Sequence, residues 1–393
     1  MRARLPASPP EHGEPFEAVL RDLDEVILPG ITHWNHPRFF AWFANTGSEP
    51  GILAELLVAA LNVNAMSWLS SPAGTELELT AVDWLGQLIG VPRGWHGHIE
   101  DTASTSTVAA LAAARTVRPG GVVYASSHAN FSVEKAARLV GLEHRPVGVD
   151  GEFRMLTDFS LADATAVVAT VGTTGTTAVD PVRDLARRCI EAGVWLHVDA
   201  AYAGAAAICP ELRWCLDGLE LADSLVVNPH KWLFTPLDCS TLWTRRPEAF
   251  HAVFSSSPDY LASTSDAVDL KDFGPALGRR FRALKLWLVL RWYGAEGLRA
   301  LIREHVRLAQ LLAALIDADP EWEVCAPHPF STVCFRHLSG DNRQIARAAS
   351  ATGELFVETA GLDGRTVIRL AIGNAATTEA DVRRAWEVLR SCA

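Results

Sequence analysis

Apolar and polar residues follow two different patterns along this chain. From about residue 15 to 70, and again after about 277, apolar residues recur every three or four positions, which is typical of amphipathic helices. Between these parts, short continuous apolar runs alternate with helical stretches. Strands buried on both faces and separated by helices favour a largely parallel sheet in an α/β fold. The runs that predict strands are 120–127, 164–172, 194–201, 223–229 and 240–245.

The pattern of predicted helices and strands changes twice along the chain, which predicts three parts. Residues 1–70 would form an N-terminal helical segment, and residues 71–294 a large α/β domain. After residue 295, helical stretches alternate with two strand-like runs, which predicts a smaller C-terminal α+β domain over 295–393. Residues 377–392, beginning Thr-Thr-Glu, have the pattern of a capped terminal helix.

Composition and charge narrow the class of protein. The 393 residues are 49% hydrophobic and 21% charged, as in ordinary globular proteins. A net charge of −11 without a basic block argues against a nucleic acid or an anionic membrane surface as partner, and no apolar run is long enough to span a membrane. The seven scattered cysteines lack a CxxC pair, and the N-terminus is too polar for a secretory signal. We therefore expect a cytoplasmic protein with reduced thiols and no metal site.

Lysine is rare here, and one lysine has an unusual setting. Of 35 basic residues only four are lysines: Lys135, Lys231, Lys271 and Lys285. Arginine keeps its proton, whereas a desolvated lysine can become a neutral amine. Lys231 follows the apolar run 225–227 within the sequence NPHKW. A surface lysine is the ordinary interpretation of such a residue, and a nucleophilic amine is the alternative.

Three further features lie just after apolar runs or before a helix. The stretch 102–104, Thr-Ala-Ser, precedes an Ala-rich helix and offers either a helix cap or a phosphate site. Asp199 ends an apolar run that predicts a strand. It is either a capping residue or a buried carboxylate, and a buried carboxylate needs a cationic partner. The Gly/Thr loop 172–180 is either a turn or a ligand loop. Ligands of α/β sheets bind beyond the carboxyl ends of the strands, so these features together with Lys231 match the needs of pyridoxal phosphate.

Longer motifs extend this constellation over the chain from about residue 16. They are LPGITHWNHPRFFAWF, SWLSSPAGTELE, HVDAAYAG, NPHKW, LGRRFRALKLW, LRWYGAEGL and VIRLAI. With them the chain resembles the group II pyridoxal-phosphate decarboxylases, above all aromatic L-amino-acid decarboxylase. The resemblance implies the type I aminotransferase-like fold and a homodimer with active sites near the subunit interface. It implies α-decarboxylation of an L-amino acid, most readily an aromatic one, to the amine and CO2.

The resemblance also implies roles for individual residues. Lys231 would form the Schiff base with the cofactor, and Asp199 would face the pyridine nitrogen. Tyr293, on a mobile loop, would protonate the product, and His197 would support the catalytic strand. The other cofactor-binding residues would be Ala103, Ser104, Thr174, Ala201, Asn228 and His230. The substrate pocket would contain Trp34, Trp42, Phe43, Asn64, Met66, Leu237 and Arg369.

Asn130 departs from the family pattern and leaves the product open. The register set by SVEKA puts Asn130 where the family has a histidine that stacks on the cofactor ring; a local shift that brings His128 inward is the alternative. Asparagine supplies neither an aromatic face nor a proton that titrates near neutral pH. In some relatives, asparagine here accompanies oxygen-consuming decarboxylation-deamination to an aldehyde. We expect the amine, because Tyr293 would act directly on the carbon left by CO2.

Two more departures bear on substrate and assembly. Asn45, Asn64, Met66 and Leu237 occupy positions that are often apolar or aromatic in the family, so an acidic, aliphatic or carrier-bound amino acid is an alternative substrate. Most of the family's N-terminal arm, which is exchanged between subunits, is missing, which weakens the case for a stable dimer. A catalytically inactive binding protein is the rival from another class, and the presence of Lys231, Asp199 and Tyr293 together argues against it.

Overall fold

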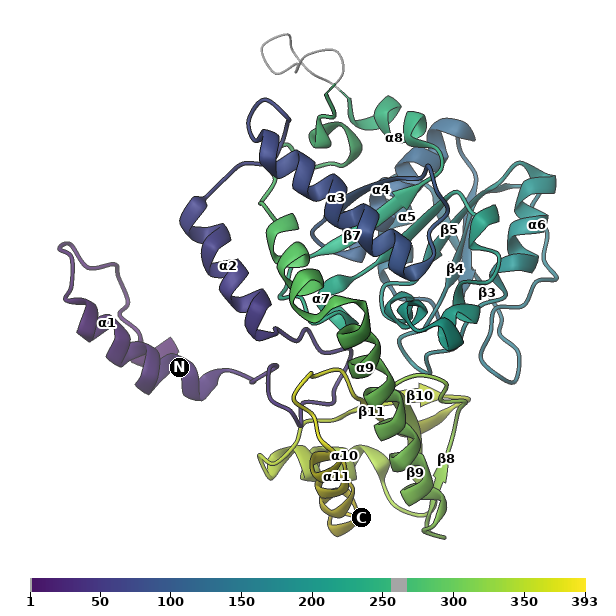
Figure 1. Ribbon diagram of the computed structural model, residues 1–393. Helices are drawn as coiled ribbons and strands as arrows, with labels where there is room; N and C mark the ends of the chain where they lie inside the picture. The colour runs from purple at the N-terminus through teal and green to yellow at the C-terminus, as the bar shows by residue number, and fades with distance from the viewer. Residues whose placement is uncertain (1, 256–266) are drawn as a thin grey trace.

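A seven-stranded sheet forms the centre of the larger part of the molecule (Figure 1). The computed structural model describes residues 2–255 and 267–393. The strand order is β1-β7-β6-β5-β4-β2-β3, with parallel pairing from β6 to β3 and antiparallel pairing of β7 with both of its neighbours. The strands are β1 (His96–Glu100), β2 (Val122–Ser126), β3 (Glu143–Val147), β4 (Ala164–Thr170), β5 (Trp195–Asp199), β6 (Ser224–Val227) and β7 (Ser240–Thr244).

Helices cover both faces of this sheet because its strands are apolar on both sides. In β2, Val123 and Ala125 face the core formed with α4, α5 and α8, whereas Val122 and Tyr124 face the core formed with α3, α6 and α9. This period of two is the one that a strand imposes. The helices are α3 (Pro72–Ile89), α4 (Ala103–Val117), α5 (Ser132–Leu139), α6 (Val182–Ala192), α7 (Pro229–Trp232), α8 (Pro247–Phe254) and α9 (Ala283–Asp317).

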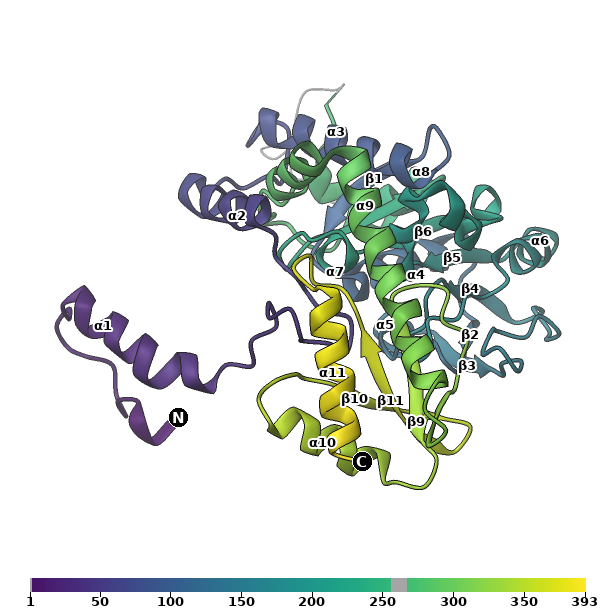
Figure 2. The same ribbon diagram turned by 60° about the horizontal axis from the view of Figure 1, so that its bottom comes forward.

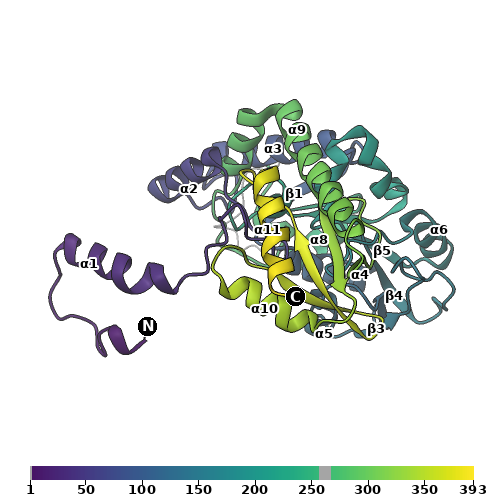
Figure 3. The ribbon, with the colours of Figure 1, turned by 90° about the horizontal axis from the view of Figure 1, so that it is seen from below.

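The C-terminal part has a second, antiparallel sheet with its own core. Its strand order is β10-β11-β9-β8, and α10 and α11 lie together on one side of it (Figures 2 and 3). The predicted capped helix is confirmed as α11, in which Thr378 and Asp381 form a capping box. The elements are β8 (Trp322–Val324), β9 (Thr332–His337), α10 (Asn342–Ala351), β10 (Glu358–Leu362), β11 (Arg365–Ala371) and α11 (Glu379–Ser391).

Helix α9 joins the two parts. Leu298 and Ile302 pack in the core of the large sheet, and Leu308 and Leu312 pack in the core of the small one. The predicted domain boundary at residue 294 lies inside this helix, at Gly294, whose φ of 60° interrupts the helical backbone. Packing therefore passes from one core to the other near the middle of α9.

The N-terminal segment lies at the outside of the molecule. Helix α1 (Phe16–Asp22) projects away from the body, and α2 (Glu49–Leu61) flanks α9 (Figures 1 and 2). Neither α1 nor any other helix within the described ranges is long and apolar enough to cross a membrane.

Candidate active site

A cavity of about 270 Å³ lies at the carboxyl ends of the central parallel strands. Thr170 ends β4, Asp199 ends β5, and Asn228 follows β6, so three neighbouring strands each deliver a polar side chain to it. This is the edge at which α/β sheets bind ligands. The predicted site residues that line it are Phe43, Ala103, Ser104, Asn130, Thr174, Asp199, Ala201, Asn228, His230, Lys231 and Leu237.

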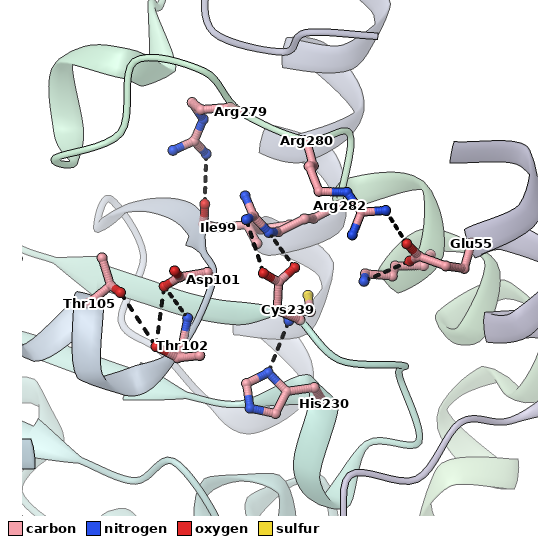
Figure 4. Close-up of polar contacts among 12 residues, drawn as sticks. Glu55, Ile99, Asp101, Thr102, Thr105, His230, Cys239, Arg279, Arg280 and Arg282 are labelled. Atoms are coloured by element: carbon pink, nitrogen blue, oxygen red, sulfur yellow. Dashed lines mark hydrogen bonds and ion pairs between the residues drawn. The ribbon is translucent and has the colours of Figure 1, made fainter. Parts of the chain in front are cut away.

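The first turn of α4 forms one side of the cavity. Thr102, at the N-cap, makes no capping hydrogen bond; its hydroxyl lies 3.2 Å from Asp101 Oδ1 instead (Figure 4). The backbone N–H groups of the first turn therefore remain for another acceptor. Ala103 and Ser104 line the cavity at this point, which suits a phosphate group.

Asp199 brings a carboxylate to the floor of the site. Only 4% of the residue is exposed, and Oδ1 accepts a hydrogen bond of 3.1 Å from the Ala201 N–H. Burial raises the pKa of Asp199, while the nearby Lys231 ammonium and the Ala201 N–H oppose that rise. A carboxylate in this position stabilises a cationic group placed next to it.

Lys231 stands on the single-turn helix α7. Its Nζ lies 5.4 Å from the centre of the Phe43 ring. Burial lowers the pKa of Lys231 and the Arg369 guanidinium lowers it further, whereas Asp199 acts in the opposite direction. The setting therefore makes the neutral, nucleophilic amine more accessible than in a surface lysine.

Two histidines beside these groups are held in the neutral form. His197 Nδ1 lies 2.8 Å from the Ser224 hydroxyl, and His230 Nδ1 accepts a hydrogen bond of 2.9 Å from the Cys239 N–H (Figure 4). Burial lowers the pKa of each histidine to about 3.

Some buried polar atoms at this site have no hydrogen-bond partner among the described residues. They include Nε2 of His197 and Oδ1 of Asn228. Buried polar atoms are nearly always paired; Asn228 lines the cavity, so its Oδ1 is available to a polar ligand, whereas His197 lies outside the lining. The donor set fits pyridoxal phosphate: N–H groups for the phosphate, a buried carboxylate for the ring nitrogen and a lysine amine for the aldehyde.

Asn130 lies inside the cavity, and His128 does not. The Asn130 amide donates a hydrogen bond of 3.1 Å to Thr174 Oγ1 and accepts one of 3.0 Å from the Ser132 N–H. The His128 ring instead stacks on Phe153, with 5.5 Å between ring centres. The alternative register with His128 inward is therefore wrong.

Arg369, on β11, approaches the site from the small domain. Its guanidinium carbon lies 4.3 Å above the centre of the Phe43 ring, and Nη1 donates to the Trp42 carbonyl. Only 4% of the residue is exposed, and its Nε and Nη2 have no partner within the described ranges. A buried cation with two unused donors is a candidate site for an anion.

The structure does not bring every predicted residue to this cavity. Tyr293 lies in helix α9, directly before the kink at Gly294, and not on a loop; its ring packs near Phe234, with 6.3 Å between ring centres. The expectation of a mobile-loop tyrosine is therefore wrong as to its place.

Besides Arg369, four predicted pocket residues lie outside the lining. Trp34 and Trp42 stack on each other, 5.0 Å apart, in an aromatic cluster with Phe39. Asn64 and Met66 lie between α2 and α3, where the Asn64 amide bonds to Met66 Sδ and to the Arg279 N–H. None of the four contributes to the cavity of its own chain.

Sequence reasoning missed four lining residues: Phe131, Ser132, Thr170 and Tyr202. Thr170 lies near the end of the predicted strand 164–172 and Tyr202 directly follows the predicted strand 194–201, so strand ends are the signal that could have found these two. The Tyr202 ring stacks on Phe43, 3.7 Å away, and its hydroxyl bonds to Ser331. A larger cavity of about 510 Å³ between α10 and β10 has arginines in its lining but no lysine or aspartate.

Comparisons with known proteins agree with this chemistry. The family model described as "Pyridoxal-dependent decarboxylase conserved domain" matches residues 1–338. Phenylacetaldehyde synthase of Arabidopsis thaliana is 38% identical over 98% of this chain and 88% of its own length. Aromatic-L-amino-acid decarboxylase of Sus scrofa is 38% identical over 100% and 89%. The crystal structure of Oryza sativa TDC with PLP and tryptamine superposes with a TM-score of 0.94 at 35% identity, covering 100% of this chain and 90% of that one.

Proposed function

The chain belongs to the pyridoxal-dependent decarboxylase family, and we propose that it removes the α-carboxylate of an aromatic L-amino acid and releases the amine. It is a pyridoxal-phosphate-dependent enzyme with the type I fold. The observation that carries the proposal is that Lys231 and the buried carboxylate of Asp199 line one cavity beside the uncapped start of α4.

Each end of the cofactor has candidate residues. Lys231 would bind the aldehyde carbon, and Asp199 would hold the protonated ring nitrogen. The first turn of α4, with Asn228 and His230, would surround the phosphate, while Ala201 and Thr174 would contact the ring. When bound, the protonated cofactor supplies a sink for the electrons left by CO2.

The substrate would bind in the cavity beside Phe43 and the Arg369 guanidinium. The Arg369 guanidinium, with its two unused buried donors, offers a partner for the substrate carboxylate. The Phe43 ring and Leu237, which is 53% exposed, offer apolar contact for an aromatic side chain. Asn45 adds one polar group to this side of the cavity, which suits an aromatic ring that carries a hydroxyl group.

The proton that completes the amine would come from Lys231. The Tyr293 hydroxyl is outside the cavity lining, and the Tyr202 hydroxyl is engaged by Ser331. Lys231 Nζ is the remaining group in the lining that can carry a proton at neutral pH and lies at the reacting end of the cavity.

Asn130 supports a second candidate product, an aldehyde. This residue places an amide, not an imidazole, against Thr174. If protonation is slow, oxygen can oxidise the electron-rich carbon, giving an aldehyde, ammonia and hydrogen peroxide. Relatives of both kinds occur, because one is named as a phenylacetaldehyde synthase and another as a decarboxylase.

The deciding experiment is a screen of purified enzyme for CO2 release across the protein amino acids, with amine, peroxide and O2 uptake measured in parallel. We expect CO2 from an aromatic amino acid, one amine per CO2 and little O2 uptake. CO2 release from acidic or aliphatic amino acids alone would overturn the aromatic assignment. O2 consumption equal to CO2 release would make the aldehyde the product.

We also propose that the enzyme is a cytoplasmic homodimer. Apolar side chains along α2 are half exposed or more, which suits burial against a second copy. Asn64 and Met66 lie just beyond α2, on the side where that copy would pack. All seven cysteines are free thiols, which is compatible with a reducing compartment.

A further inference from the structure

A buried hydrogen-bonded histidine connects the cofactor lysine to the small domain. Trp232 follows Lys231 on α7 and is fully buried. Its indole N–H donates a hydrogen bond of 2.9 Å to His305 Nδ1. On the other side of the imidazole, Nε2 lies 3.0 Å from the carbonyl oxygen of Asn374, just beyond β11. Both ring nitrogens are therefore used, and the two bonds fix a single tautomer, with the proton on Nε2.

His305 stands where α9 leaves one core and enters the other. Ile302, one turn earlier, packs with the large sheet, whereas Leu308, one turn later, packs with the small sheet. The imidazole is 1% exposed, and burial lowers its pKa to about 4, so the ring is neutral near pH 7. A neutral imidazole is what one acceptor bond and one donor bond require.

The connection continues from Trp232 to the cavity. The indole stacks on Tyr202 with 5.0 Å between ring centres and 7° between planes, and Tyr202 stacks on Phe43. Phe43 lies below both Lys231 Nζ and the Arg369 guanidinium. Lys231 comes from the large domain and Arg369 from the small one, so this stack lies where the two domains meet at the site.

From this geometry we propose that His305 is a positioning residue, which holds Trp232 and thereby keeps the Lys231 helix in register with the small domain. The proposal rests on the proposed function, because Lys231 is taken as the cofactor lysine. His305 touches neither cofactor nor substrate; it acts through the neighbour of Lys231. A single-turn helix has little rigidity of its own, so an external anchor on its last residue determines where the amine points.

The test compares variants that remove or retain the Trp232 acceptor. His305→Leu removes both hydrogen bonds, whereas His305→Asn keeps an oxygen near the position of Nδ1. The readouts are the rate at which holoenzyme loses pyridoxal phosphate and the pH midpoint of the bound cofactor's visible absorption. Since one buried hydrogen bond contributes about 1 kcal/mol, we expect His305→Leu to lose cofactor about fivefold to tenfold faster and to shift the midpoint. His305→Asn should stay within about twofold of the unmodified enzyme.

A double-mutant cycle isolates the bond from general damage. Trp232→Phe removes the indole N–H and should match His305→Leu, and the double variant should be no worse than either single one. His337→Leu is the matched control, because His337 is a buried small-domain histidine whose Nδ1 accepts a backbone hydrogen bond of 2.7 Å from Gly340. It should lower the melting temperature without changing either cofactor readout.

Two results would overturn the proposal. One is a His305→Leu enzyme with unchanged release rate and midpoint, whatever its melting temperature; the other is additive effects in the cycle. If His305→Leu does not fold, Trp232→Phe decides alone, since unchanged cofactor readouts in that variant have the same meaning. Failure of the unmodified enzyme to bind pyridoxal phosphate would instead refute the proposed function.

Discussion

At the residue scale, the proposed chemistry depends on Lys231. We expect Lys231→Ala to lose the cofactor that borohydride would otherwise fix to the protein, and to lose turnover, because no other lysine lines the cavity. Lys135→Ala is the control, since Lys135 is exposed on α5. The measurement is the mass of the protein after borohydride treatment. A fixed cofactor in Lys231→Ala would show that another amine binds it.

Asp199 can be tested against a second buried carboxylate. Asp199→Asn removes the charge that favours a protonated ring nitrogen, and we expect turnover to fall on the order of a hundredfold. Asp180 is the matched control: it is 1% exposed, accepts backbone hydrogen bonds from Thr170 and Met155, and burial raises its pKa to about 7. Because Asp180 is already close to neutral, Asp180→Asn should cost some stability but little turnover. Equal losses in both variants would contradict the role of Asp199.

In the proposed reaction, Asn130 would influence the partition between amine and aldehyde. We expect Asn130→His to raise the ratio of amine to peroxide, because an imidazole adds an aromatic face and a titratable proton next to Thr174. His128→Asn, in the same loop but stacked on Phe153, should leave the ratio unchanged. Parallel assays of amine, peroxide and O2 uptake give the ratio.

Tyr293→Phe separates the two candidate proton donors. An unchanged amine yield is expected if Lys231 gives the proton, because the Tyr293 hydroxyl lies outside the cavity lining. A shift toward aldehyde in this variant would restore Tyr293 to the role that the sequence suggested.

At the scale of elements, α2 has an exposed apolar surface of the kind that a second protein chain commonly covers. Leu53, Leu56 and Leu61 are 60%, 66% and 57% exposed. We expect Leu56→Glu to weaken the proposed homodimer, because it would place a charge in the proposed apolar interface while leaving the fold of each chain intact. Ile190→Glu is the control: Ile190 is 50% exposed and lies on α6, which is far from α2 in Figure 1. Light scattering over a range of concentrations measures the mass, and a dimer unaffected by Leu56→Glu would exclude this surface.

The elements also show what the sequence could and could not predict. Continuous apolar runs predicted β2, β4, β5, β6 and β7 because those strands are buried on both faces. The remaining two strands of the large sheet, HGHIE in β1 and EHRPV in β3, are too polar for that pattern and lie at its edges. Their place is determined by pairing with neighbours, which local pattern does not reveal.

The site divides in a similar way. Lys231 and Asp199 stand directly after predicted strands, so their meeting in one cavity follows from the parallel sheet. The family resemblance implies a mobile-loop position for Tyr293, but the residue lies in α9, directly before the kink at Gly294. The anchor at His305 depends on contacts across the chain, with Trp232 and Asn374 both far away in sequence, and no local pattern marks it.

At the scale of the whole molecule, buried titratable groups link stability to pH. His197, His230 and His305 are at most 3% exposed, and burial lowers their pKa values to about 3, 3 and 4. In the unfolded chain their pKa is near 6.5. Below that pH, the unfolded state therefore binds protons that the folded state does not bind. Their contribution to the free energy of unfolding is complete above about pH 6.5 and is lost as the pH falls toward about 4.

Asp180 acts in the opposite direction over the same range. Its pKa is raised to about 7 in the folded protein, so the folded state holds a proton that the unfolded state releases above about pH 4. Three histidines outweigh one aspartate, and we expect the free energy of unfolding to fall by up to about 3 kcal/mol per pH unit between pH 6.5 and 4.5. Urea unfolding of the holoenzyme at several pH values measures this slope. His305→Asn should flatten it by about one proton, and stability that is constant or rises on acidification would show that the buried histidines are not held neutral.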